Sequence, residues 1–110
     1  MKPGFDTLYF SEKGYVLRNQ EEGFYQLGFF SFILAMDAEE FTNICRVVAQ
    51  KNAEEDPEET NELFRNCIIP TPFNGMQLAL TRKELKELHY ILDKACDEGK
   101  ALGMINLFNP

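Results

Sequence analysis

Hydrophobic and polar positions follow the same pattern twice along this chain, 44 residues apart. Each copy has a short apolar run, then apolar residues spaced three and four apart, the period of a helix that packs on one side. Residues 32–48 and 76–92 align without a gap, so the pattern predicts a strand followed by a helix in both. The matched positions are Leu34, Ala35, Met36, Asp37, Glu40, Phe41, Ile44, Val47 and Val48 with Leu78, Ala79, Leu80, Thr81, Glu84, Leu85, Leu88, Ile91 and Leu92.

Helix starts are marked in both copies by a residue that can cap the first turn. Asp37 is followed three positions later by Glu40, and Thr81 by Glu84, the spacing of a capping box. The first helix is predicted to fray near Lys51. The second is predicted to run to about Asp97, because glycine, here Gly99, typically follows a helix C-terminus.

The correspondence extends upstream of the strands. Phe29 aligns with Phe73, and turn-forming residues precede both matched strands. The repeating unit is therefore strand, tight turn, strand, helix, with pseudo-repeats at about 24–51 and 68–98. An internal duplication and convergence of two similar units are both open interpretations.

The beginning of the chain predicts a hairpin. Two apolar runs, Thr7–Phe10 and Tyr15–Arg18, flank a polar link that ends in Gly14, as a type I turn with a bulge requires. A second turn leads to the strands of the first repeat. We therefore predict one α+β domain over residues 1–110, with a mostly antiparallel sheet built from this hairpin and the two repeats, and both helices on one face.

The segment 52–62, NAEEDPEETNE, is acidic and contains a proline. Like charges repel and proline stops a helix, so it is interpreted as a solvated connector. The alternative is an acidic arm for a basic partner. Near the other end, Ala101–Phe108 is too apolar for water, and is expected to pack across the domain as a turn or strand or to be covered by a second copy.

Charge and apolar content exclude several classes of partner. Eighteen acidic against eleven basic residues give a net charge of −7, which repels a phosphate backbone, so no nucleic acid is expected. The sequence has no apolar run long enough to cross a bilayer and no signal-peptide pattern, which predicts a cytoplasmic protein without membrane contact. The three cysteines are expected to be free thiols.

Few residues offer chemistry. His89 is the only histidine and is interpreted as structural. Cys45 and Cys96 fall on apolar helix stripes, where a thiol behaves as a small hydrophobe, and Cys67 begins a strand. The closely spaced cysteine pairs of zinc sites do not occur, nor do phosphate loops or nucleophile elbows. The sequence thus predicts no metal, no cofactor and no catalytic residue.

Aromatic residues crowd 24–32, and side chains that alternate along a strand cannot all face one core. If both helices cover one face of the sheet, the reverse face carries rings into solvent, unless the opening hairpin or the C-terminal tail covers them. Exposed apolar patches often mark interfaces. The predicted interface consists of Phe24, Phe29, Phe30, Phe32 and Phe73.

The stretches Tyr15–Arg18, Tyr25–Phe29, Glu39–Phe41, Thr71-Pro72 and Glu84-Leu85 resemble, over about 14–108, a family of short proteins of unknown function from Bacteroidetes. The resemblance implies no activity and no functional residue. Some members carry cysteines in the turn that here spans Asn19–Gly23, and their absence here argues against a metal role.

These features favour a non-catalytic cytoplasmic interaction or regulatory module that self-associates, with an unidentified protein partner as a further possibility. One alternative is a small-molecule-binding protein or enzyme, with a pocket between sheet and helices lined by Phe29, Phe73, His89 and Tyr90. Another is an acidic antagonist that acts through the connector.

Overall fold

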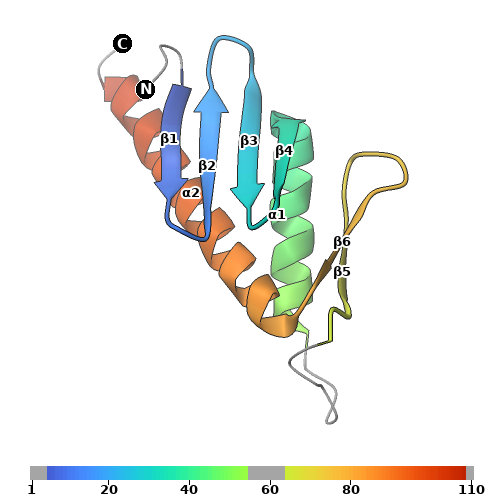
Figure 1. Ribbon diagram of the computed structural model, residues 1–110. Helices are drawn as coiled ribbons and strands as arrows, with labels where there is room; N and C mark the ends of the chain where they lie inside the picture. Colours follow the sequence, from blue (N-terminus) through green and yellow to red (C-terminus); the bar gives the residue numbers. More distant parts are fainter. Residues whose placement is uncertain (1–4, 55–63, 109–110) are drawn as a thin grey trace.

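The computed structural model describes residues 5–54 and 64–108, with side chains described as far as residue 102. Four strands, β1 (Phe5–Phe10), β2 (Gly14–Asn19), β3 (Phe24–Phe29) and β4 (Phe32–Asp37), form an antiparallel sheet in chain order (Figure 1). The predicted opening hairpin is confirmed, and the sheet is antiparallel as predicted. The remaining elements are α1 (Ala38–Ala53), β5 (Cys67–Pro70), β6 (Gln77–Leu80) and α2 (Arg82–Phe108).

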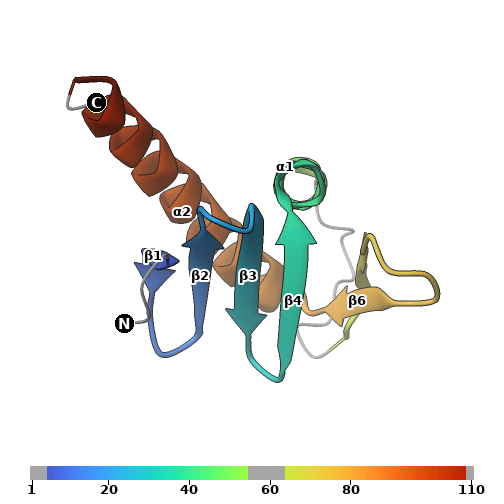
Figure 2. The same cartoon turned by 90° about the horizontal axis from the view of Figure 1, so that it is seen from above.

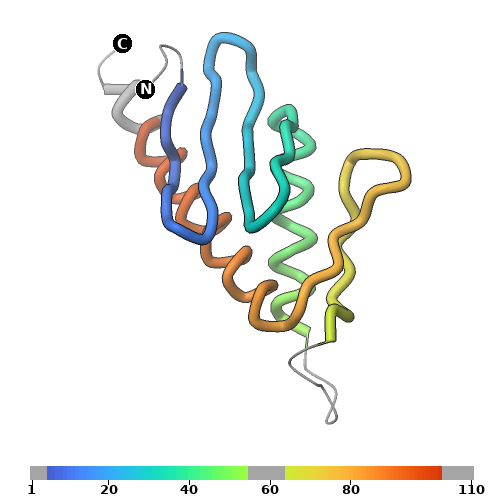
Figure 3. Tube along the Cα trace, in the orientation of Figure 1, coloured from blue at the N-terminus to red at the C-terminus, as the bar shows by residue number. Residues whose placement is uncertain are grey.

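Both helices cover one face of the four-stranded sheet, which confirms the predicted α+β architecture (Figure 2). Helix α2 contacts β1 and β2, and α1 contacts β3 and β4; Figure 3 shows α2 running diagonally behind the first two strands. Strands β5 and β6 pair only with each other in the described residues, and β5 packs against α1. The second repeat thus supplies its own small sheet instead of extending the first.

The core lies between the four-stranded sheet and the helices. Val16, Leu27 and Leu34 occupy the helix-facing side of adjacent strands, because the register pairs Val16 with Leu27 and Leu27 with Leu34. Leu85, Leu88 and Leu92 meet them from α2. Most of the apolar positions matched between the repeats are buried in both copies, whereas Val47 is only partly buried and its match Ile91 is buried. The pairs buried in both are Leu34 and Leu78, Met36 and Leu80, Phe41 and Leu85, Ile44 and Leu88, and Val48 and Leu92.

Two capping boxes start the helices as predicted. The Asp37 carboxylate accepts from the Glu40 N–H at 2.8 Å, and Glu40 accepts from the Asp37 N–H at 2.9 Å. The Thr81 hydroxyl accepts from the Glu84 N–H at 3.1 Å, and Glu84 accepts from the Thr81 N–H at 2.8 Å. The two units therefore share their local chemistry; a common origin stays a prediction.

Asp37→Ala is expected to lower the free energy of unfolding by about 1 kcal/mol, because the first turn of α1 loses its cap. Urea denaturation followed by circular dichroism would measure this. Gln50→Ala, at an exposed position of the same helix, is the control and should change stability by less than about 0.5 kcal/mol. Equal losses in both variants would contradict the assigned role of the cap.

The predicted end of the second helix at about Asp97 was wrong. Helix α2 continues through Gly99 to Phe108, so the predicted turn or strand over 101–108 is also wrong. Glycine costs a helix about 1 kcal/mol, and Leu102, which packs against the core one turn later, offsets that cost. At the other helix, α1 ends at Ala53, close to the predicted Lys51. The rest of the acidic connector, residues 55–62, lies outside the described residues.

Gly14 does not end a type I turn with a bulge, contrary to the prediction. Among the described residues, only Gly23, Gly75 and Phe30 have positive φ, and Gly14 is a buried strand residue opposite Phe29. A Cβ at Gly14 would stand 2.7 Å from the Gly28 carbonyl oxygen. Glycine is needed here for close packing. The turn itself is made by Ser11, whose hydroxyl accepts from the N–H groups of Lys13 and Gly14 at 3.2 and 3.3 Å.

Candidate interaction surface

The sheet face opposite the helices carries almost no charge. The register places Phe10 beside Tyr15, Tyr15 beside Gly28, and Gly28 beside Ile33 on this side. We call the side the open face, because no helix or strand of the described ranges lies across it (Figure 1). It consists of Phe5, Thr7, Phe10, Tyr15, Leu17, Asn19, Phe24, Gln26, Gly28, Ile33, Ala35 and Asp37.

Antiparallel sheets that are solvated on one side normally place polar side chains there. The open face differs, because Asp37 is its only charged residue and already caps α1. Phe10 and Ile33 are 73% and 62% exposed. The open face is therefore a largely apolar surface, and its polar residues other than Asp37 are uncharged: Thr7, Tyr15, Asn19 and Gln26.

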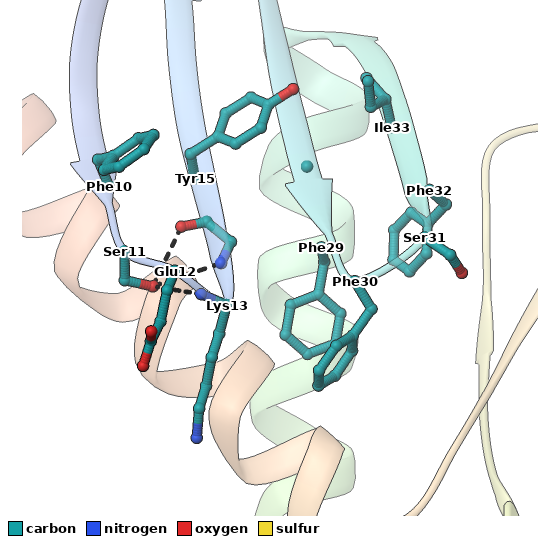
Figure 4. A pocket seen from close by; sticks show the side chains of 12 residues that line it. Phe10, Ser11, Glu12, Lys13, Tyr15, Phe29, Phe30, Ser31, Phe32 and Ile33 are labelled. Carbon is teal, nitrogen blue, oxygen red and sulfur yellow. Dashed lines mark hydrogen bonds between the residues drawn. The ribbon is translucent and has the colours of Figure 1, made fainter.

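A shallow hollow of about 500 Å³ lies at the end of the open face (Figure 4). Phe10 and Tyr15 lie on one side of it, and Phe30 and Ile33 on the other. The Tyr15 ring occupies the space that a side chain at Gly28 would need. Gln26 donates to the Tyr15 hydroxyl at 3.0 Å, which holds the ring flat on the sheet. The hollow is thus lined by aromatic rings and by Gly28, and also by Glu12 and Lys13 of the turn between β1 and β2.

The five phenylalanines predicted as an interface do not share one surface. Phe29 is 1% exposed and belongs to the core, and Phe32 packs partly buried against that core. Phe24 lies on the open face, edge to face with Phe5, and Phe30 borders the hollow. Phe73 lies in the turn of the β5–β6 hairpin, which projects away from the four-stranded sheet (Figure 1).

Sequence reasoning missed the two exposed large hydrophobic residues of the open face, Phe10 and Ile33. The prediction relied on the number of aromatic residues and did not assign alternate strand positions to opposite faces of the sheet. The signal was available at Ile33: if Leu34 and Met36 face the helices, Ile33 and Ala35 must face away. Phe10 required the register of the opening hairpin, which a bulge near Leu8 shifts by one residue.

His89 and Tyr90, the predicted pocket residues, contact different elements. His89 is partly buried, and its Nδ1 shares a hydrogen bond with the Asn52 side-chain amide at 3.1 Å, which ties α2 to the last turn of α1. Arg82 reinforces the same junction by donating to the Lys51 and Asn52 carbonyls. Tyr90 is exposed and meets Tyr9 of β1 edge to face, with ring centroids 6.1 Å apart. These contacts place His89 at the junction between α2 and the last turn of α1, where its contact is structural.

The three thiols are free. Cys67 begins β5 as predicted, whereas Cys45 and Cys96 face each other between α1 and α2 with their sulfurs 3.7 Å apart. No pattern in the sequence predicts a contact between these two cysteines, which lie 51 positions apart. Within the described residues, no group of three or more histidine, cysteine, aspartate or glutamate side chains is arranged to hold a metal ion.

Fold and surface together define a small α+β protein whose antiparallel meander is covered by helices on one side only. Comparison with protein-family models, with curated proteins and with solved structures finds no match to this chain. The resemblance to the Bacteroidetes family therefore stays a prediction. No helix in the described ranges combines the length and the apolar character needed to span a bilayer.

Proposed function

We propose that this protein is a non-catalytic cytoplasmic interaction module that self-associates by stacking the open faces of two copies. The observation that carries the proposal is the apolar, nearly uncharged character of the open face. Burial of such a surface is the main favourable term in most protein associations.

Charge favours a second copy as the occupant. The chain carries a net charge of −7, yet almost none of that charge lies on the open face. Two open faces can therefore meet without burying unpaired charges, which would be costly. A charged partner would find no complementary side chain there.

Geometry sets the expected strength. Four strands of about six residues make a surface roughly 19 by 20 Å, from strand spacings near 4.8 Å and rises near 3.4 Å. Stacked sheets lie about 10 Å apart, so exposed side chains such as Phe10 and Ile33 can interdigitate with the partner copy. Two such faces cover about 760 Å² in total, below the range of about 1,200–2,000 Å² for stable specific interfaces. We therefore expect a weak, transient association, with a dissociation constant no tighter than the micromolar range.

Sedimentation equilibrium from about 5 to about 500 µM tests the proposal. The average mass should rise from 12.7 kDa towards twice that value as concentration increases. Added salt should strengthen the association, because it screens the repulsion between two acidic copies without weakening apolar contacts. A monomer mass at every concentration would rule the proposal out.

The alternative of a ligand pocket at His89 receives less support. His89 and Tyr90 are adjacent in sequence, but one contacts α1 and the other β1.

A further inference from the structure

Two thiols lie within reach of each other on the helix side of the sheet, away from the open face. Cys45 of α1 and Cys96 of α2 are both partly buried, with a sulfur-to-sulfur distance of 3.7 Å. A disulfide bond is about 2.05 Å long, so the sulfurs need to approach by about 1.7 Å. Such a movement is small for side chains on two packed helices.

A cavity of about 400 Å³ gives a small reagent access to this pair. Arg18 of β2, Tyr25 of β3 and Lys100 of α2 line it together with both cysteines. The cavity therefore brings two cationic side chains close to the thiols. Arg18 is also ion-paired with Asp6 at 2.9 Å, whereas Lys100 makes no hydrogen bond or ion pair with the part of the chain whose side chains the structure describes.

The two sulfurs differ in acidity because they share one hydrogen bond. Donation by the Cys45 thiol stabilises the Cys96 thiolate and lowers the pKa of Cys96 to about 7. Burial opposes this shift, Lys100 supports it, and the carboxylates of Asp93 and Asp97 oppose it. The same hydrogen bond, followed by burial, raises the pKa of Cys45. Lys100, which lines the same cavity, favours the thiolate at Cys96, so we take Cys96 as the attacking thiol and Cys45 as the proton-bearing neighbour.

We propose that Cys45 and Cys96 form a modification site that hydroperoxides convert to an intramolecular disulfide. The Cys96 thiolate attacks one oxygen of hydrogen peroxide, the S–O bond forms, the O–O bond breaks, and hydroxide leaves. Cys45 then attacks the sulfur of the sulfenic acid. The S–S bond forms as the S–O bond breaks, and the oxygen departs as water with the Cys45 proton. Overall, two thiols and one peroxide give one disulfide and two waters.

The bond would link α1 to α2 and close a loop between residues 51 positions apart. A cross-link over a loop of that length restricts the unfolded chain, so the oxidised protein should melt at a higher temperature than the reduced protein. A dithiol reductant should reverse both the bond and the stabilisation by thiol–disulfide exchange. Because the site lies away from the open face, this proposal does not depend on self-association.

Peptide mapping after exposure to hydrogen peroxide tests the site directly in the full chain. Trypsin places the three cysteines on separate peptides, 19–46, 66–82 and 95–100. We expect 19–46 joined to 95–100, and an intact mass lower by about 2 Da, the two hydrogens lost on disulfide formation. Cys67→Ser is the matched control and should form the same link.

After exposure to hydrogen peroxide, Cys45→Ser should carry a sulfenic acid at Cys96, which dimedone traps. Its melting temperature should not show the rise that a dithiol reductant reverses in the wild type. A link through Cys67, or peroxide adducts without the joined peptides, would overturn the proposal. The wild-type and Cys67→Ser maps decide this even if the Cys45→Ser protein does not fold.

Discussion

Phe29→Ala should lower the free energy of unfolding by about 3–5 kcal/mol, the largest single effect we expect. Phe29 ends β3 with its ring 1% exposed on the helix side of the sheet. It packs against Phe30 and Phe32, with centroids 4.4 and 5.9 Å away. Truncation removes this buried ring and leaves a cavity that a β-sheet cannot easily collapse to fill. Urea denaturation should show a lower midpoint with an unchanged slope.

Phe24→Ala is the matched control, because it removes the same ring from the other side of the same strand. Phe24 is only partly buried and meets Phe5 edge to face at 5.9 Å. Its loss should cost about 1 kcal/mol. If Phe24→Ala destabilises as much as Phe29→Ala, the assignment of the two faces is wrong.

A double substitution, Phe10→Lys with Ile33→Lys, should weaken self-association at least about 100-fold without lowering stability. Both side chains are mostly exposed, so the monomer loses little packing. In the stacked pair, however, each copy would place two ammonium groups in an apolar interface, where desolvating unpaired charge is costly. Sedimentation equilibrium would measure the dissociation constant, and urea denaturation the stability.

Phe64→Lys with Ile68→Lys provides the control for charge and composition. These residues are also an exposed phenylalanine and isoleucine, but they lie in and just before β5, outside the open face. The control variant changes the net charge equally and should associate like the wild type, apart from a slight strengthening as repulsion falls. Equal weakening in both variants would point to net charge or to a different surface.

Local patterns predicted most of the elements because their causes are local. The capping pairs Asp37–Glu40 and Thr81–Glu84 and the switch from strand to helix period need only neighbouring residues. The meander followed from short turns between successive apolar runs. These features act within about ten residues of each other along the chain, and the structure contains them.

What sequence reasoning could not predict depends on contacts between distant segments. Gly99 suggested a helix end, but Leu102 packs on the core and extends α2. Gly14 suggested a turn, yet its role is the close approach of the Gly28 carbonyl. Contacts between distant segments also bring Cys45 next to Cys96 and bury Phe29 while its neighbour Phe30 stays exposed, so neither could be predicted from local patterns.

Amide chemical shifts, recorded by NMR at about 20 µM and about 1 mM, test most directly whether the open face is the self-association surface. We predict concentration-dependent shifts at Leu17, Gln26 and Ala35, whose side chains lie on that face, and constant shifts at Leu85 and Leu88 in the core side of α2. Spectra that do not change with concentration, or shifts confined to the helices, would contradict the account.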